Sequence, residues 1–167
     1  MLEIEKERVF YTENVSHREI ESKAAHALLE KMLLKHFGIN NPVIKKTENQ
    51  KPYVDNKNVF FSLSHTYGMV VCAVSDKEIG IDIEKITPYD MSKIKRIAGR
   101  FFTNGERETL AKDNFDSITF LKIWTRKESY IKLRGKNLIY LSEIDTENLK
   151  IDTYTENGYI ISVAKEE

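Results

Sequence analysis

The sequence predicts an α+β protein of two similar halves, each a helix packed on a small antiparallel sheet. Two observations lead to this class. Amphipathic helical periodicity appears twice, in residues 16–37 and 117–132. Each periodic segment is followed by three short apolar runs of strand length, so the order of helix and then strands repeats along the chain. We therefore expect an N-terminal half over residues 1–78 and a C-terminal half over residues 79–167.

Composition limits the classes of protein that fit. The 167 residues are 31% charged and 41% hydrophobic, as in ordinary globular domains, and the formal net charge of zero gives no global attraction to nucleic acid. No apolar run approaches the ~20 residues that span a bilayer, and residues 1–6 lack the apolar core of a signal peptide. The single cysteine, Cys72, lies in an apolar run and is predicted to be a buried thiol. We expect a cytoplasmic protein with no nucleic-acid or membrane partner.

The first half begins with a strand and a long helix. Residues 2–12 alternate weakly and predict a strand. Ser16 and Glu19 have the spacing of a capping box, which predicts the start of a helix. The apolar residues then recur every three or four positions as far as Phe37, and Gly38 ends the helix.

Short extended segments follow this helix. Residues 43–58 are polar, with a turn near Lys51 and Pro52. Three apolar runs separated by short turns predict an antiparallel meander. These runs are residues 59–64, 69–74 and 79–86.

The chain becomes helical after Pro88. Residues 91–100 predict a short basic helix, and Thr103 with Glu106 forms a second capping box that opens a helix ending near Lys112. The longest helix of this half covers residues 117–132 and ends at Gly135. Closing strands are predicted over residues 138–144, 149–154 and 159–163.

Two carboxylates share one face of the strand over residues 79–86. Because side chains alternate in a strand, Asp82 and Glu84 project from the face opposite to the isoleucines. The alternation alone favours the interpretation that the two carboxylates form the solvated face of an edge strand. A cation between the carboxylates is the second interpretation, with Glu128 as a third ligand, and three carboxylate oxygens suit Mg²⁺.

Glu128 supports the second interpretation because it lies on an apolar helical stripe with Leu121, Trp124 and Ile131. Burial of an unpaired carboxylate there would be unfavourable, and a cation would relieve the penalty. Lys132 follows one helical turn later. It is either an i,i+4 ion-pair partner of Glu128 or a phosphate ligand and proton donor.

These residues together resemble a known family. Gly80-Ile81-Asp82-Ile83-Glu84, followed by Trp124, Lys127, Glu128, Ser129 and Lys132, resembles the signature of the 4′-phosphopantetheinyl transferases. The longer, Sfp-like branch fits better than the short holo-acyl-carrier-protein synthases, because a long segment precedes Asp82. Further matches are Lys51-Pro52, Ser62-Leu63-Ser64-His65, Phe101-Phe102-Thr103 with Glu106, and Gly135-Lys136-Asn137-Leu138.

The resemblance implies a pseudo-dimer whose halves meet at a cleft for coenzyme A. The family moves the phosphopantetheine arm of coenzyme A onto a serine of an apo acyl, peptidyl or aryl carrier protein and releases adenosine 3′,5′-bisphosphate. By resemblance, Asp82, Glu84 and Glu128 would hold Mg²⁺, and the same ligands would accept Mn²⁺. Lys132 would bind the pyrophosphate and protonate the leaving phosphate, and either Glu128 or Glu106 would take the serine proton.

The resemblance also assigns contacts to coenzyme A. Ser64 and His65 would contact its phosphates, while Lys51 and Pro52 would lie by the adenine. Each of these residues also has a plainer interpretation: Ser64 as a strand end, His65 as a surface histidine, and Lys51-Pro52 as a loop dipeptide. The same applies to three further residues: Glu106 as a helix cap, Lys127 as a solvated neighbour of Arg126, and Trp124 as a packing residue.

The partner would be an acidic carrier protein. A basic segment over residues 93–100 offers a docking surface directly after the carboxylate strand, and a solvated helix face is the alternative. The sequence departs from the family before its first helix, where longer members carry a basic segment that holds the 3′-phosphate of coenzyme A. Lys23 and His26 are the candidate substitutes, and a monomer is expected.

Two other functions use the same residues. One is a Mg²⁺-dependent phosphodiester or pyrophosphate hydrolase, which would employ the same three carboxylates. The other is a non-catalytic module that binds a carrier protein or coenzyme A.

Overall fold

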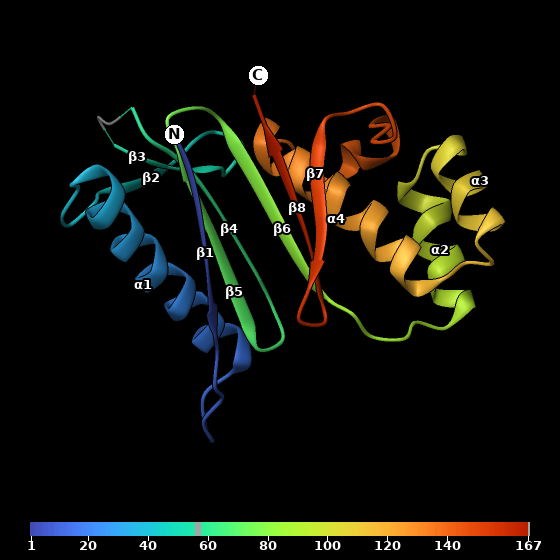
Figure 1. Cartoon of the computed structure of the whole chain (residues 1–167), viewed down its shortest axis with the longest axis horizontal. Coiled ribbons are helices and arrows are strands. Elements are labelled where there is room, and N and C mark those ends of the chain that lie inside the picture. Colours follow the sequence, from blue (N-terminus) through green and yellow to red (C-terminus); the bar gives the residue numbers. More distant parts are fainter. Residues whose placement is uncertain (56–57, 167) are drawn as a thin grey trace.

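The computed structural model describes residues 1–55 and 58–166, and Figure 1 gives their arrangement. The predicted α+β class is confirmed, since small antiparallel sheets are combined with helices. The helices are α1 (His17–Phe37), α2 (Met91–Phe101), α3 (Asn104–Lys112), α4 (Ser117–Arg134) and the 3-10 helix η1 (Leu138–Glu143). The strands are β1 (Leu2–Arg8), β2 (Ile44–Lys46), β3 (Pro52–Val54), β4 (Phe60–Thr66), β5 (Met69–Ser75), β6 (Ile79–Lys85), β7 (Ile151–Glu156) and β8 (Tyr159–Lys165).

The helix boundaries follow from their capping residues. The Ser16 hydroxyl accepts a hydrogen bond from the Glu19 amide at 3.2 Å and opens α1. Thr103 and Glu106 form a reciprocal capping box at the start of α3. Gly38 and Gly135, with φ of 65° and 59°, end α1 and α4 in the left-handed conformation that glycine adopts without strain. The helices predicted from these signals are confirmed.

The strands form two three-stranded sheets, with orders β1-β5-β4 and β6-β8-β7. The predicted meander is therefore wrong at its third strand. β6 pairs with β8, from Ile79 opposite Lys165 to Lys85 opposite Tyr159. β1 takes the free edge of β5 instead. The local sequence pattern of β6 cannot identify a pairing partner so distant in the sequence.

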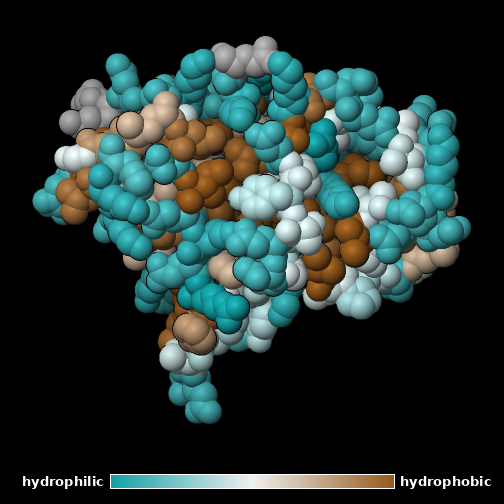
Figure 2. Space-filling view, viewed as in Figure 1, coloured by the Kyte–Doolittle hydropathy of each residue, from teal (hydrophilic) through white to brown (hydrophobic). Residues whose placement is uncertain are grey.

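The two sheets face each other across a shared apolar core. On β5, Val70 and Cys72 point toward α1, whereas Val71 and Ala73 point toward the second sheet, as strand alternation requires. Ile81 on β6 is fully buried in this central core. Figure 1 accordingly shows α1, the first sheet, the second sheet and α4 in succession, and Figure 2 shows hydrophobic residues gathered over the strands in the middle. Cys72 is the predicted core thiol, and burial raises its pKa to about 12.

Hydroxyl side chains join the sheets where β4 runs beside β6. Within the described residues, no backbone ladder pairs these two strands. Ser62 accepts a hydrogen bond from the Ile81 amide at 3.0 Å, and Ser64 donates one to Asp82 at 2.8 Å. The third contact runs from Thr66 to Glu84 at 3.4 Å. These three hydroxyls occupy alternate positions of β4, so one face of the strand forms the seam.

Gly80 brings the backbone of β6 against α4. A Cβ atom at this position would lie 2.0 Å from the Ser129 carbonyl oxygen and 2.4 Å from the Leu133 nitrogen. Any larger residue would therefore force the helix away from the strand. The close approach places the side chains of Asp82 and Glu84 directly beside α4.

One further prediction needs correction. The strand predicted over residues 138–144 is the 3-10 helix η1 followed by Ile144, and the buried residues Leu141 and Ile144 are three positions apart, the spacing of one 3-10 turn. The polar stretch at 43–58 contains the β2–β3 hairpin, in which the Thr47 amide donates a hydrogen bond to the Lys51 carbonyl at 2.9 Å; residues 56–57 lie outside the described part.

In the described residues, no helix combines the length and hydrophobicity needed to cross a membrane.

Candidate active site

Side chains from both sheets and α4 enclose a cavity of about 400 Å³ at the β4–β6 seam. Six of the predicted site residues line it, together with two apolar ones: Ser64, His65, Asp82, Glu84, Glu128, Lys132, Leu63 and Trp124. The structure thus brings together residues as far apart in the sequence as Leu63 and Lys132. A concave site with several convergent polar groups is the usual form of an active site.

Asp82 is the most constrained of the three carboxylates. It is only 5% exposed, so it does not belong to a solvated edge-strand face. Its Oδ1 accepts hydrogen bonds from Ser64 at 2.8 Å and from Lys132 at 2.7 Å. Its Oδ2 is buried without a hydrogen-bond partner within the described residues. An unsatisfied buried carboxylate oxygen is costly, and a bound cation would satisfy it.

Glu84 and Glu128 have strongly perturbed ionisation. Burial, followed by the charge of Asp82, raises the pKa of each to about 7 from the ordinary 4.5. Lys132 acts in the opposite direction on both groups. Asp82 therefore repels both glutamates, and a cation placed among the carboxylates would lower the pKa of Glu84 and of Glu128.

Lys132 projects from α4 to the opposite wall of the cavity. Its Nζ donates to Ser64 at 2.9 Å as well as to Asp82. The predicted i,i+4 pair with Glu128 is not among the ion pairs of the described residues, which place Lys132 on Asp82 instead. Its side chain remains 30% exposed, so the ammonium can reach an anion in the cavity.

His65 lies at the rim of the same cavity. It is 39% exposed, and its Nδ1 lies 2.9 Å from Oε2 of Glu21 on α1. The sequence gives no direct indication of Glu21, because a glutamate at a helix position next to apolar residues has many equivalents in this chain. The contact requires α1 to pack on β4, which the local pattern does not specify.

Lys51 and Pro52 line a second cavity of about 240 Å³, which shares Leu63 and Lys132 with the first. Lys51 is not free within it: its Nζ pairs with Glu78 and donates to the Leu133 carbonyl at 2.7 Å. Gly135 lies beneath the aliphatic part of Lys51. Lys51 thus ties the β2–β3 hairpin to the end of α4 and forms a wall of the second cavity.

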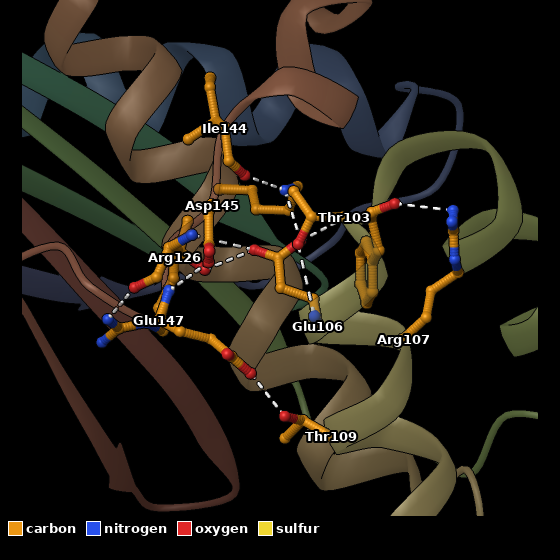
Figure 3. A network of polar contacts seen from close by, with 11 residues as sticks. Thr103, Glu106, Arg107, Thr109, Arg126, Ile144, Asp145 and Glu147 are labelled. Atoms are coloured by element: carbon orange, nitrogen blue, oxygen red, sulfur yellow. Dashed lines mark hydrogen bonds and ion pairs between the residues drawn. The ribbon is translucent and has the colours of Figure 1, made fainter.

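Glu106 lies apart from the carboxylate cavity. It is fully buried and bonded on both oxygens: Oε2 to the Thr103 amide at 2.9 Å and to Lys127 at 2.6 Å, and Oε1 to the Thr146 hydroxyl at 2.7 Å and amide at 3.1 Å. Figure 3 shows this network between α3, α4 and the segment that includes Ile144 and Asp145. Each acceptor position of Glu106 is occupied, which identifies it as a structural anchor.

The interpretation of Lys127 as a solvated neighbour of Arg126 is wrong. Its side chain is 0% exposed, and its Nζ binds Glu106 and the Ile144 carbonyl. Burial lowers the pKa of Lys127, while the charge of Glu106 raises it. Its position, three residues after Trp124 and four before Ile131, is the signal that could have placed it on the buried stripe.

The remaining candidates lie on the surface. The basic residues of α2 are exposed, and two sit over aromatic rings: Lys93 over Tyr89 at 4.1 Å and Lys95 over Phe115 at 4.5 Å. Lys23 pairs with Glu19 on the outer face of α1, and His26 is exposed. Trp124 packs against Phe101 and Phe120 and also lines the cavity, so packing and site formation coincide.

The carboxylates of this cavity are of the ligand type that a divalent metal such as Mg²⁺ takes. Among residues 1–55 and 58–166, no three His, Cys, Asp or Glu side chains are already arranged as a metal site. The unpartnered Oδ2 of Asp82 and the pKa values of Glu84 and Glu128, both raised by burial and by the charge of Asp82, nevertheless fit a hard cation with oxygen ligands.

Comparison with known proteins supports the resemblance. The model of the 4′-phosphopantetheinyl transferase superfamily matches residues 78–166, which is more than half of the chain. Relatives include 4′-phosphopantetheinyl transferases of Aneurinibacillus migulanus (39% identical over 66% of this chain and 46% of the relative) and of Bacillus subtilis (36% over 80% and 59%). The 4′-phosphopantetheinyl transferase HetI of a Nostoc species is 31% identical over 78% of this chain and 60% of its own. The chain thus spans about half to three fifths of the length of these relatives. The match covers the whole sheet β6-β8-β7 and α4, and on this evidence the chain belongs to the 4′-phosphopantetheinyl transferase superfamily.

Proposed function

We propose that this chain transfers the 4′-phosphopantetheine arm of coenzyme A to a serine of an apo acyl or peptidyl carrier protein. The observation that carries the proposal is the unpartnered buried Oδ2 of Asp82, in a cavity that also holds Glu84, Glu128 and Lys132. Carboxylates alone would repel a pyrophosphate. With a divalent cation and Lys132, the same cavity suits a pyrophosphate and the charge that develops as its bond breaks.

Asp82, Glu84 and Glu128 would hold the cation, with Mg²⁺ as the physiological choice and Mn²⁺ as an alternative. The bound ion would neutralise charge on the pyrophosphate of coenzyme A. Ser64 and Lys132 already hold Oδ1 of Asp82, which leaves Oδ2 directed to a ligand. This arrangement supports Asp82 as the carboxylate best prepared to bind the cation.

The protein side chains supply the proton transfers. The carrier serine oxygen would attack the phosphorus that bears the pantetheine arm, and Glu128 would take the serine proton. Lys132 would bind the pyrophosphate and protonate the leaving adenosine 3′,5′-bisphosphate. We assign the base to Glu128 rather than Glu106 because Glu106 lies in the saturated network with Lys127 and Thr146.

The rest of the substrate would occupy the neighbouring cavity. Its wall includes Lys51 and Pro52, and it shares Leu63 and Lys132 with the carboxylate cavity, which supports placing the adenine end there. His65 at the rim would contact a phosphate. We further propose that residues 1–78 and 79–167 are two related halves, each a helix on a three-stranded sheet, working as a cytoplasmic monomer.

A single assay tests the function against its two rivals. The protein is incubated with coenzyme A, Mg²⁺ and an apo-carrier protein, and the carrier is weighed by mass spectrometry. Addition of the phosphopantetheine arm supports the transferase. Cleavage of coenzyme A without addition would identify a hydrolase, and neither change would leave a binding module.

Charge reversal on α2 tests the carrier docking surface. Lys93 and Arg96 are exposed on this helix. In the Lys93→Glu/Arg96→Glu variant, we expect the KM for an acidic carrier to rise about tenfold, because two attractive contacts become repulsive. Affinity for coenzyme A should not change. The control reverses Arg8 and Lys77 in the first half of the chain, and unchanged carrier kinetics in the α2 variant would exclude this surface.

The pH dependence of stability tests the cation site. In the metal-free protein the pKa of Glu84 and of Glu128 is raised to about 7, above the ordinary value of 4.5, so the folded state holds more protons than the unfolded state between these values. The free energy of unfolding should therefore fall as the pH rises from about 5 to 8. Mg²⁺ should reverse most of this fall, measured as Tm with chelator and with Mg²⁺. A metal-free Tm that rises across this window would contradict the prediction.

A further inference from the structure

A buried carboxylate outside the metal site connects α1 to the cavity rim. Glu21, on α1, is 8% exposed and belongs to a helix face that otherwise buries apolar side chains such as Ala25 and Leu28. A leucine at this position would pack there without the desolvation penalty of a carboxylate. The charge at position 21 therefore needs an explanation beyond packing.

Both oxygens of Glu21 are engaged by aromatic side chains. Oε1 accepts a hydrogen bond from the Tyr11 hydroxyl at 2.5 Å, and Oε2 lies 2.9 Å from Nδ1 of His65. The contact to His65 crosses from α1 to β4. Glu21 is thus the link between an anchoring tyrosine and a histidine that lines the cavity with Ser64 and Lys132.

Tyr11 is itself held in one orientation. Its hydroxyl accepts a hydrogen bond from the Gly68 amide at 2.7 Å, which leaves its proton directed to Glu21. Its ring stacks on His17 with centroids 3.9 Å apart and lies 4.9 Å from the ring of Tyr67. Burial and the charge of Glu21 raise the pKa of Tyr11 to about 12, so Tyr11 remains a donor at neutral pH.

This chain of contacts determines how His65 presents its ring. With Nδ1 facing the Glu21 carboxylate, Nδ1 carries the proton and Nε2 is the remaining nitrogen. The side chain of His65 is 39% exposed, so Nε2 is accessible. In the imidazolium form both ring nitrogens donate, so Nδ1–H can bind Glu21 while Nε2–H binds an anion such as a phosphate oxygen.

We propose that Glu21 is a positioning residue that, anchored by Tyr11, orients His65 so that Nε2 donates to a phosphate oxygen of bound coenzyme A. The inference rests on the proposed function for the identity of the anion. It adds two residues, Glu21 and Tyr11, that do not touch the substrate. It also gives α1 a role in substrate affinity, exerted through His65.

A double-mutant cycle on coenzyme A binding tests this inference. Binding is measured calorimetrically without a carrier protein, for the whole chain and for the Glu21→Gln, His65→Ala and double variants. We expect Glu21→Gln to weaken binding about threefold to tenfold, because the charge assistance to His65 is lost while the shape is kept. In the His65→Ala background the same change should have no further effect, since Glu21 acts through His65.

Matched variants distinguish positioning from folding. Glu19→Gln removes an exposed carboxylate from the same helix and should leave binding unchanged. Tyr11→Phe removes the anchor and should weaken binding in the same direction as Glu21→Gln, with Tm recorded for every variant. The inference is overturned if Glu21→Gln leaves coenzyme A binding unchanged, or if it weakens binding equally in the unaltered chain and in the His65→Ala background. Either result would leave the proposed function standing. Failure of the unaltered chain to bind coenzyme A overturns the proposed function as well.

Discussion

Glu128→Gln is expected to reduce phosphopantetheine transfer by at least ~10³-fold, because one substitution removes both a proposed cation ligand and the proposed general base. The amide keeps the size of the side chain but cannot accept the serine proton. It also removes one of the three charges that would hold Mg²⁺. Transfer is measured by mass spectrometry of the carrier protein at saturating coenzyme A and Mg²⁺.

This loss should occur without unfolding. In the metal-free site, burial raises the pKa of Glu128, and the charges of Asp82 and Glu84 raise it further, so an ionised Glu128 is unfavourable there. Removing the charge of Glu128 should therefore preserve or increase the Tm of the metal-free protein at pH 8. Glu108→Gln, an exposed change on α3, is the matched control. Turnover within threefold of the unaltered chain would remove Glu128 from both roles.

Lys127→Met is expected to destabilise the protein by ~3–5 kcal/mol, because it leaves the buried carboxylate of Glu106 without its cation. Both side chains are 0% exposed and lie 2.6 Å apart. Glu106 would retain its bonds to Thr103 and Thr146, which hold the charge in place rather than neutralise it. The free energy of unfolding in urea measures the effect.

A second substitution should recover part of the loss. In Lys127→Met/Glu106→Gln the buried site is neutral, so the double variant should be more stable than Lys127→Met alone. Lys122→Met, an exposed change on the same helix, should alter stability by no more than ~0.5 kcal/mol. A loss of less than ~1 kcal/mol in Lys127→Met would show that the pair does not anchor α3 to α4.

Local signals predicted the helices and the carboxylate strand well. Ser16, Thr103 and Gly135 act where capping chemistry places them, because a cap depends on residues within four positions. Asp82 and Glu84 share a face because alternation is a property of one strand. Alternation alone favoured a solvated face for Asp82 and Glu84; Glu128 on an apolar stripe, with Lys132 one turn later, suggested a shared site, and the family resemblance then supported it.

The remaining features depend on contacts between distant segments. Lys127 is buried because Glu106 and Ile144 approach it from other elements, and no window around position 127 contains both. β6 pairs with β8, its partner lying about half the chain away. Leu138 and Ile139 read as a strand because a short apolar run does not distinguish a strand from a 3-10 turn. Glu21 meets His65 only when α1 covers β4.

The two walls of the cleft are held by different kinds of contact. Because β6 and α4 touch backbone to backbone at Gly80, neither element can come closer to the other at this residue. The opposite wall, β4, meets β6 through the hydroxyls of Ser62, Ser64 and Thr66 rather than a backbone ladder. The carboxylate wall is therefore positioned by the main chain of two elements, whereas the position of the β4 wall depends on side chains that a single substitution can remove.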